Sequence, residues 1–99
     1  MKMKCIIVDD EPLARKGLRE YISGVDFLEL QAECENATKA NNIIQSQQVH
    51  LVFLDIQMPA VSGIDFLKSL SDPPMVIFTT AYSEFAIDGY ALNVIDYLV

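Results

Sequence analysis

The fold of this chain is decided by residues 51–59, with the sequence LVFLDIQMP, in which an apolar run ends in the carboxylate of Asp55. A short apolar run that is bounded by turn residues is typical of a strand buried on both faces. Such strands belong to parallel sheets that are covered by helices. In open sheets of this kind, ligands bind in the crevice beyond the carboxyl ends of the strands. We therefore expect Asp55 to lie at the functional edge of a central strand.

Length and composition allow one domain with one core. The chain has 99 residues, 52% of them hydrophobic, and a formal net charge of −7. An acidic chain is a poor ligand for nucleic acid, because affinity for a phosphate backbone comes mainly from Lys and Arg. No apolar run approaches the roughly 20 residues that span a bilayer, and the start of the chain lacks the pattern of a secretion signal. We therefore expect a cytoplasmic protein that has no membrane partner, and whose charge suits a cation.

The two cysteines, Cys5 and Cys34, fall at the start of the first apolar run and at the end of the second. If these runs are neighbouring parallel strands, their offset places the two thiols beyond disulfide reach. We interpret both cysteines as small apolar residues of the core in a reducing compartment.

Strand and helix patterns alternate along the chain. Five strands are expected at residues 5–8, 27–34, 51–55, 75–78 and 93–99, and four helices at about 12–24, 36–48, 63–70 and 82–91. This alternation implies right-handed crossovers and a mainly parallel sheet. A chain this short favours the flavodoxin-like, doubly wound α/β fold with five strands in the order 2-1-3-4-5. Residues 27–34 are expected to form an edge strand.

Acidic residues follow the first and third strands, which are neighbours in this order. Asp9 and Asp10 end the first strand, and Asp55 ends the third. Carboxylates this close repel one another and raise one another's pKa unless a cation neutralises them. A few hard oxygen ligands, with water completing the shell, suit Mg²⁺ better than zinc. The sequence therefore predicts a Mg²⁺ site at this edge of the sheet.

The fourth strand ends at the same edge with the hydroxyls of Thr79 and Thr80. Successive side chains of a strand point to opposite faces, so only one hydroxyl can face Asp55. Thr80 is the better candidate, because the small Ala81 after it leaves space for a ligand. A carboxylate, a cation, a hydroxyl and backbone N–H groups together suit a phosphoryl group, with Asp55 as the nucleophile.

Three motifs resemble the receiver domain of two-component response regulators: residues 8–12, residues 53–59 with 62–63, and residues 79–82. The similarity covers essentially the whole chain. Finer details, at residues 10–15, 79–82, 85–86 and 93–98, look like receivers that precede a LytTR-type DNA-binding domain.

The resemblance implies roles for the acidic residues. Asp55 would accept a phosphoryl group from a sensor histidine kinase. Asp10, Asp55 and the backbone carbonyl of Gln57 would bind Mg²⁺, and Asp9 would help through water. The domain would then be a regulatory phosphoacceptor and not an enzyme.

The resemblance also implies a conformational switch. Thr80 would be the switch hydroxyl, with Ala81 beside it at the ligand site, and Tyr97 the switch aromatic. A new dianion at Asp55 would draw Thr80 inward and vacate a space for the ring.

Receivers carry a Lys followed by Pro after the fifth strand, whereas this sequence ends at Val99. We therefore expect residues 1–99 to be a receiver domain cut before that motif and before its fifth helix, with DNA bound only through an output domain outside this sequence.

Four helices leave one face of a five-stranded sheet short of cover. We expect the fifth strand and the side of the first helix that carries Leu18 and Ile22 to expose apolar surface there. The chain should then form a homodimer or self-associate in another way, exchange its terminal strand with a neighbour, or be markedly less stable than a chain extended by one helix.

Other functional classes fit less well. A flavodoxin needs hydroxyls and glycines after its first strand to cradle a phosphate, which residues 9–11 would repel. A haloacid-dehalogenase-type phosphatase needs a second aspartate two residues after the first, where this chain has Gln57. The remaining alternative is a receiver-like interaction module that does not turn over phosphate. His50, the single histidine, is interpreted as a solvated residue and not as a phosphorelay group.

Overall fold

The computed structural model describes residues 2–55, 63–70, 72–79 and 94–97, and the statements below concern these residues. They form β1 (Met3–Val8), α1 (Pro12–Ser23), β2 (Leu28–Cys34), α2 (Ala37–Ser46), β3 (Leu51–Leu54), α3 (Gly63–Lys68), β4 (Met75–Phe78) and β5 (Val94–Tyr97). The helix expected at residues 82–91 lies outside the described residues. Within them, no helix combines the length and the apolar character that crossing a bilayer requires.

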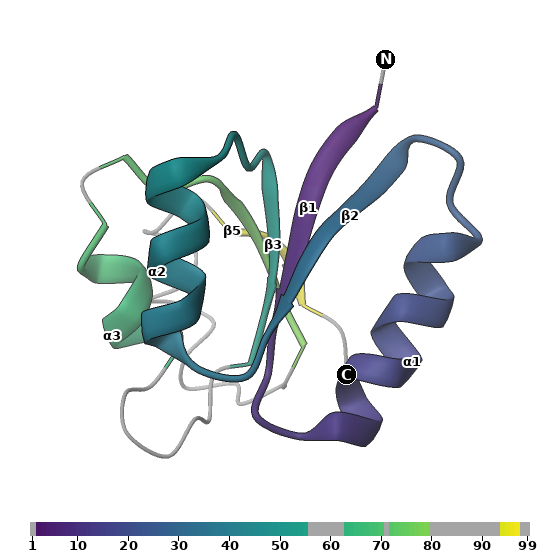
Figure 1. Cartoon of the computed structure of the whole chain (residues 1–99), viewed down its shortest axis with the longest axis horizontal. Helices are drawn as coiled ribbons and strands as arrows, with labels where there is room; N and C mark the ends of the chain where they lie inside the picture. Colours follow the sequence, from purple (N-terminus) through teal and green to yellow (C-terminus); the bar gives the residue numbers. More distant parts are fainter. Residues whose placement is uncertain (1, 56–62, 71, 80–93, 98–99) are drawn as a thin grey trace.

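The five strands form one parallel sheet in the order β2-β1-β3-β4-β5. α1 lies on one face of this sheet, and α2 and α3 lie on the other (Figure 1). This is the flavodoxin-like, doubly wound arrangement that the sequence predicts, with β2 at one edge and β3 in the centre. β1 and β3 are neighbours, so their carboxyl ends lie side by side at the carboxyl-terminal edge of the sheet, the edge formed by the strand ends.

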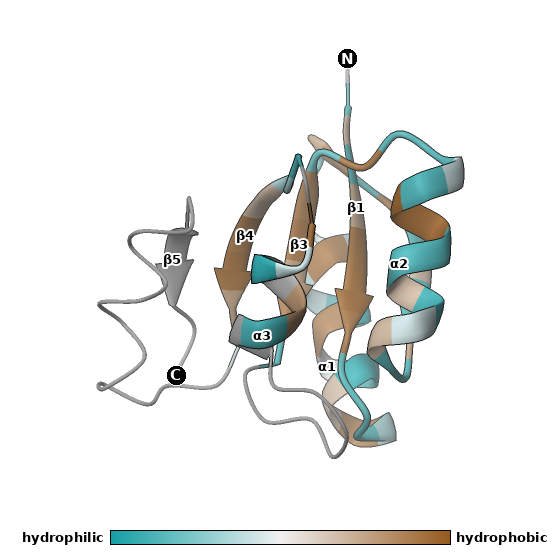
Figure 2. Ribbon diagram, turned by 90° about the vertical axis from the view of Figure 1, so that its left-hand side faces the viewer, coloured by the Kyte–Doolittle hydropathy of each residue, from teal (hydrophilic) through white to brown (hydrophobic). Residues whose placement is uncertain are grey.

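The core lies on both faces of the sheet, because successive side chains of each strand alternate between them. The central strands are hydrophobic along their length (Figure 2). On the face of α2 and α3, strand residues meet Ala40 and Phe66, and on the face of α1 they meet Ile22. The largest side chains that are almost fully enclosed include Phe53 and Phe78. A sheet buried in this way holds its strand ends in fixed positions.

Two helix starts follow from local chemistry. Pro12 is the first residue of α1, where its missing N–H would have no partner in any case. Asn36 caps α2, since its Oδ1 accepts a hydrogen bond from the Lys39 N–H at 2.8 Å. Both starts agree with the sequence prediction.

Some expectations for the face of α1 were wrong. Ile22 is 1% exposed, not exposed as predicted, because it packs against the sheet residues of this face, and Leu18 is partly buried there. Tyr21 is 55% exposed, although its ring meets Phe53 edge-on with centroids 6.4 Å apart. Phe27 lies before β2 and is exposed. The exposed apolar surface of α1 and of its connection to β2 is therefore carried by Leu13, Tyr21 and Phe27.

Both cysteines are free and buried, as expected. Burial raises the pKa of the Cys5 thiol to about 11, and burial also raises the pKa of Cys34. Both groups are therefore neutral thiols near neutral pH, which suits their place in the core.

His50 lies at the amino-terminal ends of the strands, where it directly precedes β3 and forms hydrogen bonds with β1 and β4. Its Nδ1 accepts a hydrogen bond from the Lys4 N–H at 2.9 Å, and its own N–H donates to the Lys4 carbonyl at 2.8 Å. Its carbonyl accepts from the Met75 N–H at 3.2 Å. The interpretation of His50 as a solvated residue was wrong, because the imidazole is partly buried and satisfies a backbone donor of β1.

We predict that His50→Ala destabilises the fold. The Lys4 N–H would lose its acceptor in a partly buried position, which costs about 1–3 kcal/mol. Urea denaturation monitored by circular dichroism measures this loss. Gln48→Ala, an exposed change in the same connection, should alter the free energy of unfolding by less than about 0.5 kcal/mol. Equal stability of the two variants would contradict the role given to the imidazole.

Candidate functional site

The site begins where β1 and β3 end side by side. Val8 pairs with Leu54 in the sheet, so the next residues, Asp9 and Asp55, leave the two strands at the same level. The Asp55 N–H donates to the Val8 carbonyl at 2.9 Å, which extends the pairing by one residue. Both carboxylates are therefore placed by the register of buried strands.

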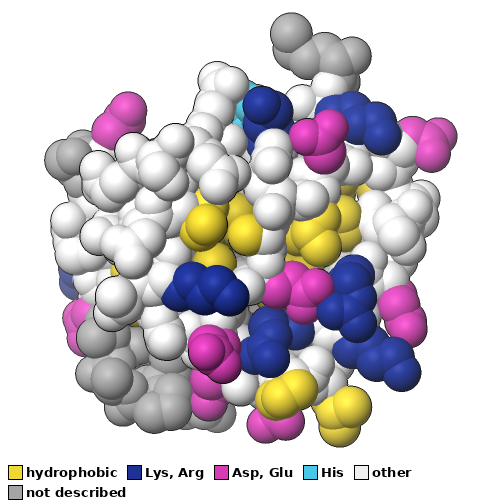
Figure 3. All heavy atoms as spheres, viewed as in Figure 1, with side chains coloured by type: hydrophobic (Ala, Val, Ile, Leu, Met, Phe, Trp, Pro, Cys, Tyr) yellow, Lys and Arg dark blue, Asp and Glu magenta, His cyan; other side chains and the backbone are white. Residues whose placement is uncertain are grey.

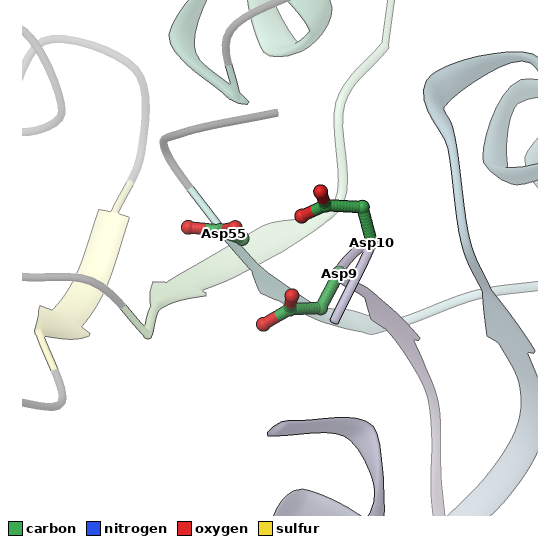
Figure 4. Close-up of side chains that lie close together, drawn as sticks. All are labelled: Asp9, Asp10 and Asp55. Carbon is green, nitrogen blue, oxygen red and sulfur yellow. The ribbon is translucent and has the colours of Figure 1, made fainter. Parts of the chain in front are cut away.

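Three carboxylates meet at this edge of the sheet. Each of Asp9, Asp10 and Asp55 contributes an oxygen, and these oxygens lie within 4.8 Å of one another. Figure 4 shows the Asp9 and Asp10 side chains extending from the end of β1 toward the side where Asp55 ends β3. Asp9 is 4% exposed and Asp55 is 7% exposed, whereas Asp10 is exposed. The predicted convergence of the three carboxylates is confirmed.

Asp9 is held by three of its groups. Its N–H donates to the Cys34 carbonyl of β2 at 3.0 Å. Its Oδ1 accepts from the Glu11 N–H at 2.9 Å, which forms the turn into α1. Its carbonyl oxygen accepts from Nη1 of Arg15 at 2.8 Å. The turn that carries Asp9 and Asp10 is therefore tied to β2 and to α1.

The pKa of the Asp9 carboxyl is raised above its ordinary value. Burial is the largest cause, and the negative charges of Asp55 and Asp10 add to it. The hydrogen bond from the Glu11 N–H and the positive charge of Arg15 act in the opposite direction. The ionised form of Asp9 is therefore costly in the bare site, and a cation would relieve this cost.

The ligands that the site offers fit a small, hard cation. All three side chains provide carboxylate oxygens, which Mg²⁺ and Ca²⁺ prefer, and one of the three carboxylates faces water. Mg²⁺ keeps several of its own waters and needs only a few protein ligands. Gln57, whose carbonyl was expected to join the site, lies outside the described residues. Within the described ranges, Asp9, Asp10 and Asp55 are the residues that could hold the metal.

The end of β4 brings a hydroxyl to the same edge. The Thr79 N–H donates to the Leu54 carbonyl at 3.0 Å, so Thr79 lies next to Asp55 along the edge. Its Oγ1 is buried and has no hydrogen-bond partner in the part of the chain that the structure describes. Thr80 and Ala81 lie outside that part. Thr79 is therefore a polar group near the site to which the sequence analysis gave no role.

Tyr97, the predicted switch aromatic, is the last residue of β5, and its backbone pairs with Phe78 of β4. Tyr97 therefore lies on the strand next to β4, opposite Phe78, the residue that precedes Thr79. The position of its side chain is not described.

Sequence reasoning also gave no role to Arg15 and Glu33. Arg15 lies in α1, and its Nε is 3.9 Å from Oε1 of Glu33 in β2. The one signal in the sequence was an arginine placed six residues after Asp9, near the start of the helix that follows the acidic pair. Without the packing of α1 against β2, this signal has no specific meaning.

Comparisons with known proteins agree with this geometry. The transcriptional regulatory protein BtsR of Salmonella typhi is 42% identical over 100 residues, which cover 98% of this chain and 41% of that protein. The sensory transduction protein LytR of Staphylococcus haemolyticus is 39% identical over 100 residues, which cover 98% of this chain and 39% of that protein. The chain thus spans about two-fifths of the length of these relatives.

A solved structure of a response regulatory domain is also similar to this chain. The response regulatory domain of MrkE from Klebsiella pneumoniae superposes with a TM-score of 0.86 at 29% sequence identity, covering 98% of this chain and 82% of that one. Residues 5–99 match the response regulator receiver domain family. Because this match covers almost the whole sequence and agrees with the sheet order, the chain belongs to the response regulator receiver domain family of two-component systems.

Proposed function

We propose that Asp55 is the phosphoacceptor of this receiver domain and takes a phosphoryl group from a sensor histidine kinase. The observation that carries the proposal is the position of Asp55, which ends the central strand with its carboxylate oxygen within 4.8 Å of those of Asp9 and Asp10. A carboxylate so placed has a fixed backbone and two further acidic side chains that could bind a cation beside it.

In the proposed reaction, a carboxylate oxygen of Asp55 attacks the phosphorus of the donor. The bond from phosphorus to the donor atom breaks, and its electron pair stays with the donor, which for the kinase is an imidazole nitrogen. The product is an aspartyl phosphate. Bound Mg²⁺ would supply positive charge for the oxygens of the transferred group.

The other acidic residues at the carboxyl ends of β1 and β3 would bind the metal and orient it beside Asp55. Asp10 and Asp55 would contact Mg²⁺ directly, Asp9 would contact it through water, and the backbone carbonyl of Gln57 would complete the protein ligands. Asp9 is well suited to a fixed role, because its carboxylate is buried and already accepts a hydrogen bond from the turn.

We further propose that the phosphoryl group is sensed at the end of β4. Thr80 would be the switch hydroxyl, Ala81 would leave space for the ligand, and Tyr97 would be the aromatic that responds. In support, Thr79 next to Thr80 is placed beside Asp55 by the pairing of β3 with β4. A charged group formed at Asp55 would thus act on the adjacent strands first.

We also propose a role for this domain in a longer regulatory protein. The relatives named above are transcriptional or sensory regulators that are more than twice as long as this chain. Residues 1–99 would act as the cytoplasmic receiver domain of a LytTR-type regulator, whose contact with DNA is made by a separate output domain. Self-association of receiver domains would then control that output.

We predict that the domain binds Mg²⁺, and that Asp10→Asn and Asp55→Asn each weaken binding about tenfold or more, since even outer-shell partners of a metal contribute about 10–100-fold. Isothermal titration calorimetry or amide shifts during Mg²⁺ titration measure this effect. Asp26→Asn is the matched control, because it removes the same charge from an exposed position in the α1–β2 connection. If the titrations of wild type and Asp55→Asn were identical, the metal site would be excluded.

We predict that Asp9→Asn stabilises the metal-free protein at pH 7. The folded state raises the Asp9 pKa, so it binds more protons than the unfolded state, and wild-type stability falls as pH rises from the unfolded value, about 3.9, through the raised folded value. Asn keeps an oxygen that can accept from Glu11 but carries no charge. Each unit by which the pKa is raised corresponds to about 1.4 kcal/mol.

Urea denaturation in a chelator, at pH 7 and below pH 4, checks this prediction. The advantage of Asp9→Asn should be present at pH 7 and should shrink at the acidic pH, while Asp26→Asn shows no such difference. An Asp9→Asn protein that is less stable than wild type at pH 7 would show that the bare carboxylate is not strained by its surroundings.

We predict that acetyl phosphate with Mg²⁺ adds one phosphoryl group, and that peptide mass spectrometry finds it on Asp55. Asp55→Asn should abolish the modification and Asp10→Asn should slow it about tenfold or more, whereas Asp26→Asn should leave it unchanged. A phosphoryl group on Asp9 or Asp10 would refute the assignment of the acceptor. Complete lack of modification in a protein that binds Mg²⁺ would favour an interaction module without phosphate turnover.

A further inference from the structure

Arg15 joins the acidic turn to α1 and β2. Its Nη1 donates to the carbonyl oxygen of Asp9 at 2.8 Å, and its Nε lies 3.9 Å from Oε1 of Glu33. The side chain is 19% exposed, so most of it is shielded from water. One planar cation thus faces a backbone oxygen of the acidic turn on one side and a carboxylate of the edge strand on the other.

Glu33 is held in turn by a second arginine. Nη1 of Arg19 lies 2.9 Å from Oε1 and 2.7 Å from Oε2 of Glu33. Arg15 and Arg19 are four residues apart and therefore share one face of α1. Figure 3 shows Lys and Arg side chains gathered around an acidic side chain on the face of the molecule that carries α1 and β2. Glu33 thus has a fixed position from which it can orient Arg15.

The contact from Arg15 differs from the other two contacts of Asp9. Those come from backbone groups of Cys34 and Glu11, whereas the carbonyl of Asp9 is held by a side chain. That carbonyl belongs to the planar peptide unit that links Asp9 to Asp10. Holding its oxygen therefore sets the orientation of the link between two residues of the acidic cluster.

We propose that Arg15 is a positioning residue of the metal site, and that Glu33 keeps it in place. The inference rests on the proposed function, because it takes Mg²⁺ as the ligand of Asp9, Asp10 and Asp55. Arg15 would not touch the metal. It would fix the turn so that the carboxylates of Asp9 and Asp10 face Asp55 before the metal arrives, as outer-shell groups do in metal sites.

A purely electrostatic role of Arg15 predicts the opposite result from a positioning role. A fixed positive charge near the site repels Mg²⁺, so its removal would tighten binding if charge alone mattered. If Arg15 positions the turn, its removal weakens binding although the local charge becomes more favourable. The sign of the change therefore separates the two roles.

The experiment compares Mg²⁺ affinities of folded variants by calorimetry, with folding checked by circular dichroism. Arg15→Gln should weaken Mg²⁺ binding about tenfold, the lower end of the effect of outer-shell partners. Arg15→Lys should weaken it about threefold, because a single ammonium cannot face both Asp9 and Glu33 as the guanidinium does. Glu33→Gln, which keeps the charge of Arg15 but loosens it, should also weaken binding about threefold.

Lys16→Gln is the control, since it removes one positive charge from an exposed neighbour of Arg15 and should change the affinity less than twofold. Wild-type or tighter binding by Arg15→Gln would overturn the proposal, as would equal weakening by Lys16→Gln. If Arg15→Gln fails to fold, Glu33→Gln decides against Glu35→Gln, which removes the same negative charge from an exposed position two residues along the chain. Equal affinities of these two variants overturn the proposal, and weaker binding by Glu33→Gln supports it.

A second measurement separates this inference from the proposed function. In the metal-free protein, hydrogen exchange of the Glu11 amide reports the bond to Oδ1 of Asp9. Arg15→Gln should accelerate this exchange several-fold relative to wild type, and Lys16→Gln should not. If wild type binds no Mg²⁺, the proposed metal site fails, and unchanged Glu11 exchange in Arg15→Gln would separately refute the positioning of Asp9.

Discussion

The parallel pairing of β1 with β3 is the constraint on which the rest of the site depends. Residues 5–8 of β1 and all of β3 are apolar and buried, so the register that opposes Val8 to Leu54 is fixed by core packing. A shift of one residue would turn every side chain of a strand to the other face and would bury the wrong set. The same register sets Asp9 beside Asp55. The core thus determines where the charges lie, although the buried members of the two core clusters that the structure describes are all apolar.

The buried carboxylates at the strand ends oppose the stability that core packing provides. Two of the three clustered carboxylates are almost fully buried, and the ionised form of Asp9 is disfavoured by burial and by its neighbours. Such an arrangement lowers the stability of a small domain, whose total is only about 5–15 kcal/mol. It is tolerated where a ligand relieves it, which is common at functional sites. The hydrogen bond from the Glu11 N–H and the positive charge of Arg15 offset part of this cost without removing the charge.

The strands, their order and the acidic cluster could be predicted from the sequence, because they depend on periodicity and on general rules of α/β topology. The contacts of Arg15 with Glu33 could not, since they join α1 to β2 across many residues and depend on how the helix packs. The role of His50 was missed for the same reason, as its partner Lys4 is 46 residues away. Ile22 was expected to be exposed, because the sequence does not show how closely α1 approaches the sheet.

The two buried thiols give the molecule internal reporters of strand separation. Cys5 lies in β1 near the middle of the sheet, and Cys34 ends the edge strand β2. Reagents that attack thiolates reach such groups only when the surrounding structure opens, and the raised pKa values slow the attack further. The labelling rate at Cys34 therefore follows detachment of the edge strand, while that at Cys5 follows opening of the central sheet. The native sequence thus allows the two events to be timed separately without any added probe.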